Sequence, residues 1–222
     1  SKLIKSIKVP VLAEEKLDSE PLEPAQTLPE SPYILHTGSL SDKKDGITGM
    51  LKAFALALPE LAQEVKFVMT GYIEYSNDKL KILEVIDKFK IREKVIFTGF
   101  VSVKHLSHLQ KHASLAIINK PFTEQNLYNF PTKLAEYMLH GIPVVATRYG
   151  EITNYLTDNV NVYFVDKGDP ELMAEKITDA FTNELKRHFI SENGMKLAQK
   201  EFDIVYQGAR MKEFFSNLLL KP

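Results

Sequence analysis

The sequence predicts an α/β fold, in which about six mainly parallel strands are flanked by helices. From Tyr33 onward, short apolar segments alternate with longer segments of helical periodicity, the order expected of right-handed βαβ units. Several apolar segments are continuous and do not alternate with polar residues, which is typical of strands covered on both faces. Hydrophobic residues make up 44% of the 222 residues and charged residues 26%, a composition compatible with one sizeable core.

The strands and helices are expected to alternate along the chain. Strands are predicted at residues 33–37, 66–70, 94–98, 115–118, 142–146 and 161–165. Helices are predicted between them at about residues 46–58, 78–90, 103–112, 132–140 and 151–156. From Asp169, an expected N-cap followed by Pro170, the pattern predicts three more helices to the end of the chain. This order is that of a Rossmann-like domain.

The first 32 residues are interpreted as an interdomain linker that precedes a domain at residues 33–222. Residues 8–12 are a candidate edge strand. Residues 14–32 are acidic and rich in proline, which is the composition of an extended linker. A chain that opens on a linker suggests a piece of a longer protein.

Charge and composition exclude several classes of function. The net charge of −1 provides no general attraction to nucleic acid or to an anionic membrane, so any anion site has to be local. The chain contains no cysteine, no apolar run near the roughly 18 residues of a spanning helix, and no signal peptide. We therefore expect a cytoplasmic protein; peripheral association of the full-length protein with the inner face of the membrane stays open.

The histidines do not predict a metal site. His105, His108 and His112 fall on one face of a predicted helix, but no cysteine or carboxylate accompanies them in a zinc-like spacing. We interpret them as part of an amphipathic helix face. No metal and no cofactor is expected.

Residues 129–147 form the most informative segment of the chain. The segment predicts a turn, a short helix opened by Pro131, a glycine stop at Gly141 and a buried strand. Lys133 and Glu136 are polar residues that a purely structural helix does not require. A helix N-terminus beside a lysine suits an anion, and a carboxylate one turn further on can accept hydrogen bonds from sugar hydroxyls.

Glycines follow the first three predicted strands. Gly38, Gly71 and Gly99 each stand at a strand exit, where they allow close approach of the backbone to a ligand. Ligands of parallel sheets bind outside the carboxyl ends of the strands, so the three glycines favour one shared crevice. The alternative, that each glycine only turns the chain, stays open.

These segments in this order resemble the C-terminal, donor-nucleotide-binding domain of retaining GT-B glycosyltransferases, specifically the large GT4 family. The resemblance covers about residues 9–222, with landmarks at residues 38–46, 67–71, 95–101 and 130–145. It implies one half of a GT-B fold, a nucleotide-sugar donor bound at these loops, and an acceptor-binding domain before Ser1. It also suggests a place in polysaccharide biosynthesis.

The resemblance implies roles for particular residues. Glu136 falls on the second glutamate of the family's E-x7-E motif, which holds the ribose hydroxyls; the alternative is a solvated helix glutamate. Lys133 and the backbone N–H groups of Thr132 and Leu134 would lie near the diphosphate. Phe100 and Val101 stand where the family cradles the base.

The loop after the first strand carries the other implied contacts. Gly38, Ser39 and Lys44, with Gly71 from the next loop, would line the donor site, and Lys44 falls near the lysine that the family uses on the diphosphate. A cation there stabilises the charge that the leaving group gains, so Lys44 and Glu136 are the residues expected to take part in catalysis. Lys43 is adjacent and is an alternative partner.

Two positions depart from the family pattern. Ser39 stands where an arginine often follows the first strand's glycine, so one phosphate charge is missing. Tyr128 stands where the motif has its first glutamate, which usually contacts the transferred sugar. Glu124, four residues earlier, is an alternative for that role. These departures put the identity of the donor sugar in doubt.

The sequence therefore predicts the donor-binding half of a glycosyltransferase that uses a UDP- or GDP-sugar, with retention of configuration implied by the resemblance. The chain alone is expected to bind nucleotide without useful turnover. Two alternatives stay open. One is a non-catalytic nucleotide-binding or regulatory module, motivated by Ser39 and Tyr128. The other is a different GT-B enzyme, such as a nucleotide-sugar epimerase or a phosphorylase.

Overall fold

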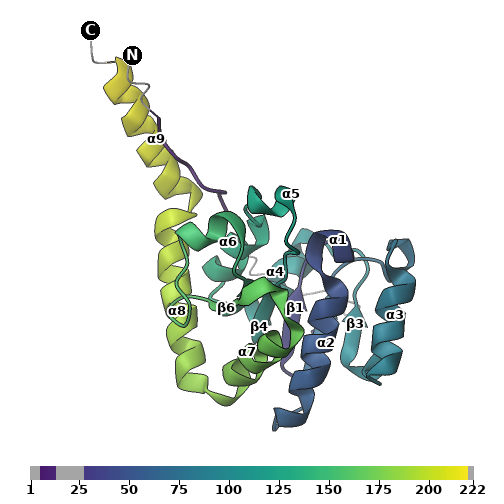
Figure 1. Cartoon of the computed structure of the whole chain (residues 1–222). Helices are drawn as coiled ribbons and strands as arrows, with labels where there is room; N and C mark the ends of the chain where they lie inside the picture. Colours follow the sequence, from purple (N-terminus) through teal and green to yellow (C-terminus); the bar gives the residue numbers. More distant parts are fainter. Residues whose placement is uncertain (1–5, 14–27, 220–222) are drawn as a thin grey trace.

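A computed structural model describes residues 6–13 and 28–219 of the chain (Figure 1). In this part of the chain six strands form one sheet in the order β3-β2-β1-β4-β5-β6. The strands are β1 (Tyr33–His36), β2 (Lys66–Met69), β3 (Val95–Phe97), β4 (Leu115–Ile118), β5 (Val144–Thr147) and β6 (Tyr163–Val165). Every neighbouring pair is parallel, so the expected α/β class is confirmed. The strand order changes direction between β1 and β4, which is the switch point of the sheet.

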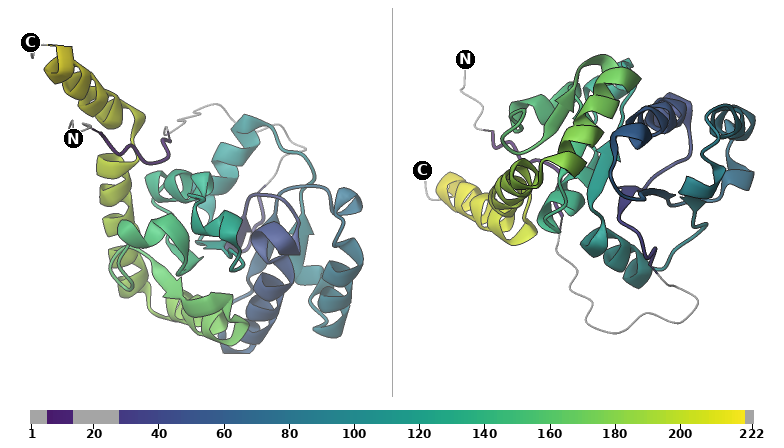
Figure 2. Two further views of the ribbon diagram at one scale, coloured as in Figure 1. Left: turned by 45° about the horizontal axis from the view of Figure 1, so that its top comes forward. Right: turned by 90° about the horizontal axis from the view of Figure 1, so that it is seen from below.

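The helices cover both faces of the sheet (Figure 2). They are α1 (Asp42–Asp45), α2 (Ile47–Ala57), α3 (Lys79–Lys88), α4 (Val103–His112), α5 (Glu124–Leu127), α6 (Thr132–Leu139), α7 (Pro170–Thr182), α8 (Glu184–Glu201) and α9 (Ile204–Leu219). One core cluster joins α2, α3 and α7 to one face, and a second joins α4, α6 and α8 to the other. Successive strand residues alternate between the clusters, as Ile34 and Leu35 do, because strand side chains point to opposite faces.

Four parts of the chain differ from the sequence prediction. α1 and α5 were not expected, since four residues are too few for a helical period. The predicted helix at 151–156 is instead a 3-10 turn at Gly150–Asn154. Residues 8–12 form no strand of the sheet, and the edge-strand interpretation is wrong. Pro10 lacks a donor, and the segment instead reaches the α8–α9 corner, where Ala13 N–H donates to Phe202 O at 2.9 Å.

The structure describes only part of the predicted linker. Residues 1–5 and 14–27, which include Pro21 and Pro24, lie outside the described residues. The domain boundary at residue 33 therefore stays a prediction.

α6 has the ends that its sequence predicts, with one shift. Pro131 is the N-cap and not the first helical residue. Gly141 has a φ of 67° and follows the helix, as expected of a glycine stop. Its N–H donates to Met138 O, and Ile142 N–H donates to Tyr137 O, so the last turn is closed. The buried face of α6 packs on the sheet and leaves its N-terminus at the rim where the strands end.

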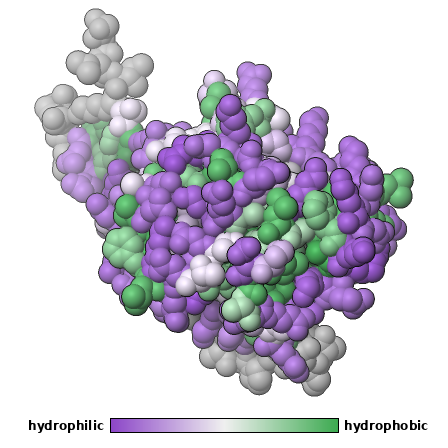
Figure 3. All heavy atoms as spheres, turned by 60° about the horizontal axis from the view of Figure 1, so that its bottom comes forward, coloured by the Kyte–Doolittle hydropathy of each residue, from purple (hydrophilic) through white to green (hydrophobic). Residues whose placement is uncertain are grey.

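Figure 3 shows the face at the bottom of Figure 1, where hydrophilic side chains surround small hydrophobic groups. α2 and α7 pack side by side and enclose a hollow of about 510 Å³, which we name the α2–α7 groove. It is lined by Leu56, Glu60, Glu171, Ala174, Glu175, Thr178, Asp179 and Thr182. None of these residues belongs to the loops that follow the strands' carboxyl ends, so the groove is separate from the predicted crevice.

Candidate functional site

A cavity of about 150 Å³ opens at the carboxyl ends of β1 and β4, at the switch point. We name it the switch-point cavity. It is lined by His36, Thr37, Asp45, Ile118, Lys120, Asn129, Phe130, Pro131, Thr132 and Lys133. The lining comes from the exits of two central strands, from α1 and from the segment that leads into α6. The sequence predicted a shared crevice at the exits of the first three strands, whereas this cavity lies between the exits of β1 and β4, where the general rule for parallel sheets expects a ligand.

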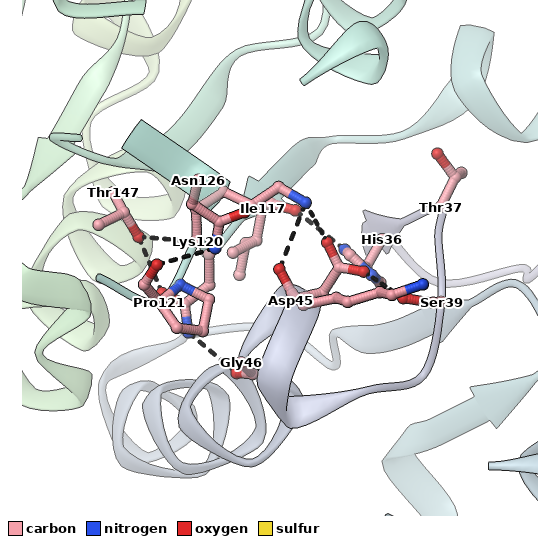
Figure 4. Close-up of polar contacts among 12 residues, drawn as sticks. His36, Thr37, Ser39, Asp45, Gly46, Ile117, Lys120, Pro121, Asn126 and Thr147 are labelled. Atoms are coloured by element: carbon pink, nitrogen blue, oxygen red, sulfur yellow. Dashed lines mark hydrogen bonds and ion pairs between the residues drawn. The ribbon is translucent and has the colours of Figure 1, made fainter. Parts of the chain in front are cut away.

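A largely buried ion pair lines the switch-point cavity (Figure 4). Lys120 Nζ pairs with Asp45 Oδ1, and Ser39 Oγ donates to Asp45 Oδ2 at 2.5 Å. Burial by itself raises the pKa of the Asp45 carboxyl, but the hydrogen bonds from Lys120 and Ser39 outweigh burial and hold the pKa below its ordinary value. Asp45 is therefore ionised at neutral pH and balances the charge of Lys120.

His36 lies beside this pair and is 3% exposed. Its Nδ1 lies 3.2 Å from Ile117 O, and because a carbonyl only accepts, Nδ1 carries the proton. Burial lowers the pKa of the ring, so His36 is neutral at pH 7. Nε2 is then an acceptor, and it has no hydrogen-bond partner among the described residues.

Three further hydrogen bonds hold the loops around the cavity in place. Thr37 N–H donates to Tyr137 Oη at 2.7 Å, which ties the exit of β1 to α6. Asn119 donates to Gly46 O at 2.9 Å and accepts from Thr147 Oγ1 at 2.8 Å, which ties the exit of β4 to α2 and β5. The positions of the charged groups are thus set by contacts across four elements.

The N-terminus of α6 forms the opposite wall of the switch-point cavity. The first N–H groups of a helix have no acceptor within the helix, and they carry partial positive charge. Lys133 is half-buried in the first turn of α6 and lines the cavity. No carboxylate within 6–13 or 28–219 pairs with Lys133, in contrast to Lys120. The wall therefore presents an unbalanced positive charge.

Four of the predicted site residues come together in a second hollow of about 370 Å³, which we name the glycine-loop cavity. Its lining is Gly38, Ser39, Leu40, Ser41, Lys44, Gly71, Tyr72, Tyr75, Ser76 and Asn77. Ser39 connects it to the switch-point cavity through Asp45. Lys43 is exposed and belongs to neither lining.

Glu136 lies in a third hollow, the α4–α6 cavity of about 280 Å³. This cavity is lined by Leu12, Ala13, Val103, Leu106, Ser107, Gln110, Glu136 and His140. Gln110 Nε2 donates to Glu136 Oε2 at 3.0 Å, and the carboxylate is half-buried. Glu136 and Lys133 thus stand one turn apart on α6 but line different hollows.

Of the remaining predicted residues, Thr132 lies in the switch-point lining, and Leu134, Phe100 and Val101 lie outside the three linings. Leu134 is fully buried, so only its backbone is available to a ligand, and Thr132 is exposed at the cavity edge. Phe100 is 82% exposed, while Val101 packs against the second core cluster. Their roles toward a base stay a prediction.

Neither alternative for the missing first glutamate lines the switch-point cavity. Tyr128 is 79% exposed at the end of α5, and Glu124 is exposed at its start. Asn129, the residue after Tyr128, is the one that lines the cavity. The question which of the two replaces the glutamate stays open.

His36, Asp45 and Lys120 were not identified from the sequence. A signal for Lys120 was present, since it follows the fourth predicted strand and the strand-exit rule applies to charged residues as well as to glycines. Asp45 stands between Lys44 and the glycine of a loop that had already been singled out. The pairing of Asp45 with Lys120 across 75 positions left no local trace.

Residues 19–197 match the model of one protein family, described as glycosyl transferases group 1. The chain belongs to this family. An uncharacterized glycosyltransferase of Methanocaldococcus jannaschii is 27% identical over 164 residues, which is 73% of this chain and 39% of that protein. The chain thus spans less than half the length of that relative.

Several solved structures share the fold of this domain. HepE of Anabaena in complex with UDP-glucose superimposes with a TM-score of 0.70 and 23% identity, over 85% of this chain and 49% of HepE. A glycosyltransferase of Rickettsia africae gives 0.72 and 18%, over 88% and 50%. The C-terminal domain of LpcC from Francisella tularensis gives 0.67 and 17%, over 79% and 87%. The domain is therefore the C-terminal half of a GT-B glycosyltransferase fold.

No helix within 6–13 or 28–219 combines the length and the hydropathy that crossing a bilayer requires. The same residues contain no group of three or more His, Asp or Glu side chains placed to hold a metal ion.

Proposed function

We propose that this domain binds the nucleotide-sugar donor of a retaining, GT4-type glycosyltransferase, with the diphosphate of a UDP- or GDP-sugar at the switch-point cavity. The observation that carries the proposal is the wall formed by Lys133 and the N-terminus of α6 at the switch point of a parallel sheet. A helix N-terminus and an unpaired lysine attract an anion by fixed dipoles and by charge. The complexes of HepE with UDP and with UDP-glucose support a nucleotide-sugar as the ligand class.

Charge balance supports Lys133 over Lys120 as the main phosphate cation. Asp45 neutralises Lys120, and Ser39 donates its hydroxyl hydrogen to the same carboxylate. Lys44 borders the adjoining glycine-loop cavity, from which we propose that it stabilises the leaving diphosphate as the glycosidic bond breaks. Lys43 is exposed and outside that lining, which makes it the weaker candidate.

We assign the ribose to Glu136. Gln110 donates to Oε2 and orients the carboxylate, and Oε1 is left to accept from ribose hydroxyls. The α4–α6 cavity next to it leads toward the start of α4, where Phe100 and Val101 would face the base. Leu12 and Ala13 border this cavity, so the segment before the domain would lie beside the nucleoside.

The acceptor site belongs in this proposal to the rest of a longer protein. Transfer in a GT-B enzyme takes place between two halves, so the present chain would bind donor without turning it over. We place the full-length enzyme in the cytoplasm, with metal-independent chemistry.

Calorimetry with matched ligands tests the proposal. UDP, GDP, ADP and inorganic pyrophosphate are titrated against wild type, Lys133→Ala and Glu136→Gln, with Lys212→Ala on the exposed face of α9 as control. Loss of one charge-assisted hydrogen bond corresponds to about tenfold in affinity. Lys133→Ala should therefore weaken UDP and pyrophosphate alike, while Glu136→Gln should weaken only the ligands that carry ribose. The assignment of Glu136 fails if Glu136→Gln binds every nucleotide as wild type does.

A non-catalytic nucleotide-binding module is the second candidate. Tyr128 is exposed and does not line the switch-point cavity, which favours this candidate. The carboxylate in that lining is Asp45, which is already paired with Lys120. Incubation of the full-length protein with UDP- and GDP-sugars separates the two. Release of free nucleoside diphosphate supports the enzyme, and tight binding without release supports the module.

A further inference from the structure

His36 brings a ring nitrogen without a partner to the lining of the switch-point cavity (Figure 4). Nδ1–H donates to Ile117 O at 3.2 Å, and this bond fixes both the tautomer and the direction of the ring. Nε2 therefore keeps a lone pair, which no hydrogen-bond donor among the described residues reaches. A diphosphate cannot satisfy this lone pair either, because its oxygens only accept hydrogen bonds. The neutral ring and the proposed ligand thus do not match.

Nε2 faces bare backbone next to the carboxylate of Asp45. A Cβ on Gly38 would lie 3.1 Å from Nε2 and 3.5 Å from Asp45 Oδ2, so the nitrogen and the carboxylate oxygen border the same position. Asp45 Oδ2 accepts one hydrogen bond, from Ser39 Oγ, and a carboxylate oxygen has a second lone pair. A proton on Nε2 would therefore lie close to a negative charge.

Three charged side chains act on the His36 ring. Asp45 from α1 favours a charged ring, whereas Lys120, which follows β4, and Lys133 on α6 disfavour it. Burial adds to the effect of the two lysines, so the ring is neutral in the free chain. The Tyr137 hydroxyl, bound to the residue after His36, stays neutral because burial raises its pKa. With one negative and two positive groups, the lining has one positive charge in excess.

The diphosphate of a nucleotide-sugar reverses this balance. It carries one negative charge on each phosphate, so the lining with its ligand has one negative charge in excess. Lys44 does not correct the excess fully, because it is exposed and its charge is screened by solvent. Among the side chains of this lining, His36 is the one with an ordinary pKa near neutral pH, and a nearby negative charge favours its protonated form.

We propose that His36 takes up a proton at Nε2 when the diphosphate of a nucleotide-sugar enters the switch-point cavity. The proton comes from the solvent, and the charged ring restores the balance of the lining while Nδ1 stays bound to Ile117 O. The inference rests on the proposed function, because its ligand is the diphosphate of the donor. A site that gains a proton on binding holds its ligand more tightly as the pH falls, by up to about tenfold per pH unit.

Calorimetry in buffers of different ionisation enthalpy counts the protons. UDP-glucose and GDP-mannose are titrated into this chain near pH 6.5 in Mes, Pipes and imidazole buffers. Free UDP is a poorer probe, because its terminal phosphate itself titrates at about pH 6. We expect the wild type to take up roughly 0.5 to 1 proton per nucleotide-sugar bound. In His36→Gln the uptake should fall close to zero, and the dependence of affinity on pH should flatten.

His105→Gln is the matched control. Like His36, His105 has a buried Nε2 without a hydrogen-bond partner among the described residues, and burial lowers its pKa. It lies on α4 and outside the linings of the three cavities at the strand ends and α6. This variant should therefore take up as many protons as the wild type.

Nitrogen-15 NMR of the wild type is a second measurement, which does not depend on the folding of a variant. Saturation with UDP-glucose should move the His36 Nε2 signal from that of an unprotonated to that of a protonated nitrogen. Binding of a nucleotide-sugar without proton uptake, or equal uptake in His36→Gln and wild type, would refute the inference and leave the proposed function standing. If neither nucleotide-sugar binds, the proposed function and this inference are both wrong.

Discussion

The α2–α7 groove is larger than the switch-point cavity, but the chemistry of its lining is simpler. The groove holds about 510 Å³ and the cavity about 150 Å³. The groove is lined by the flanks of two helices, and its carboxylates are exposed or, like Asp179, paired at the surface with Lys186. The cavity gathers a buried ion pair, a neutral histidine and a helix N-terminus from four separate segments. Function in a parallel sheet follows the convergence of loops at the strand ends and not the volume of a hollow.

The largest expected effect is on folding stability at the ion pair of the cavity. Asp45→Ala leaves the mostly buried Lys120 without its partner, and it should lower the free energy of unfolding by about 3 kcal/mol. Urea denaturation of wild type and variant measures the loss. The double variant Asp45→Ala/Lys120→Met should recover part of it, because no unpaired charge remains. A loss below about 1 kcal/mol in Asp45→Ala would show that the pair is solvated.

The second effect is a pH dependence at His36. Burial lowers the pKa of the folded ring, so below about pH 6.5 the unfolded chain takes up a proton that the folded chain does not. Stability should therefore fall as the pH drops from 6.5 toward 5, by up to about 1.4 kcal/mol per pH unit. His36→Gln should remove this slope. His105, whose pKa burial also lowers, is present in both proteins and cancels in the difference. Parallel stability curves for the two proteins would contradict the prediction.

The smallest effect is expected in the α2–α7 groove. Glu175→Ala removes an exposed carboxylate from α7, and it should change the free energy of unfolding by no more than about 0.5 kcal/mol. Calorimetry should give the same UDP affinity as wild type. A clear loss of nucleotide affinity in Glu175→Ala would break the contrast between the two hollows.

The sequence predicted most of the sheet because each strand is a short apolar run that is buried almost throughout, as β4 and β5 are. α6 was predicted closely because Pro131 and Gly141 mark its two ends. α1 and α5 were missed because one turn has no period, and residues 8–12 were misassigned because their partner is a helix corner. Local pattern carries no information on such a partner.

The sequence also predicted part of the site, again only where a local pattern was sufficient. The strand-exit rule predicted a crevice beside the glycines that follow the first three strands, and Gly38 and Gly71 line one hollow there together with Ser39 and Lys44. The separation of Glu136 from Lys133 was not foreseen, because the neighbour of a helix face is set by packing, here by Gln110 of α4. The network of Asp45, Lys120 and His36 joins segments far apart in the chain. Its members were recognisable as candidates, but their contacts were not.

The contact of Ala13 with the α8–α9 corner has a mechanical consequence. Ala13 N–H donates to Phe202 O, and Ile204 N–H donates to Ala13 O at 3.3 Å, so the incoming segment and the start of α9 are stitched together at one point. Figure 1 shows α9 and the purple incoming segment leaving the body side by side. Lys8 also pairs with Glu151, and Val11 packs against the second core cluster, so residues 8–13 are fixed to the domain at further points. We therefore expect this segment and the start of α9 to move with the domain as one body.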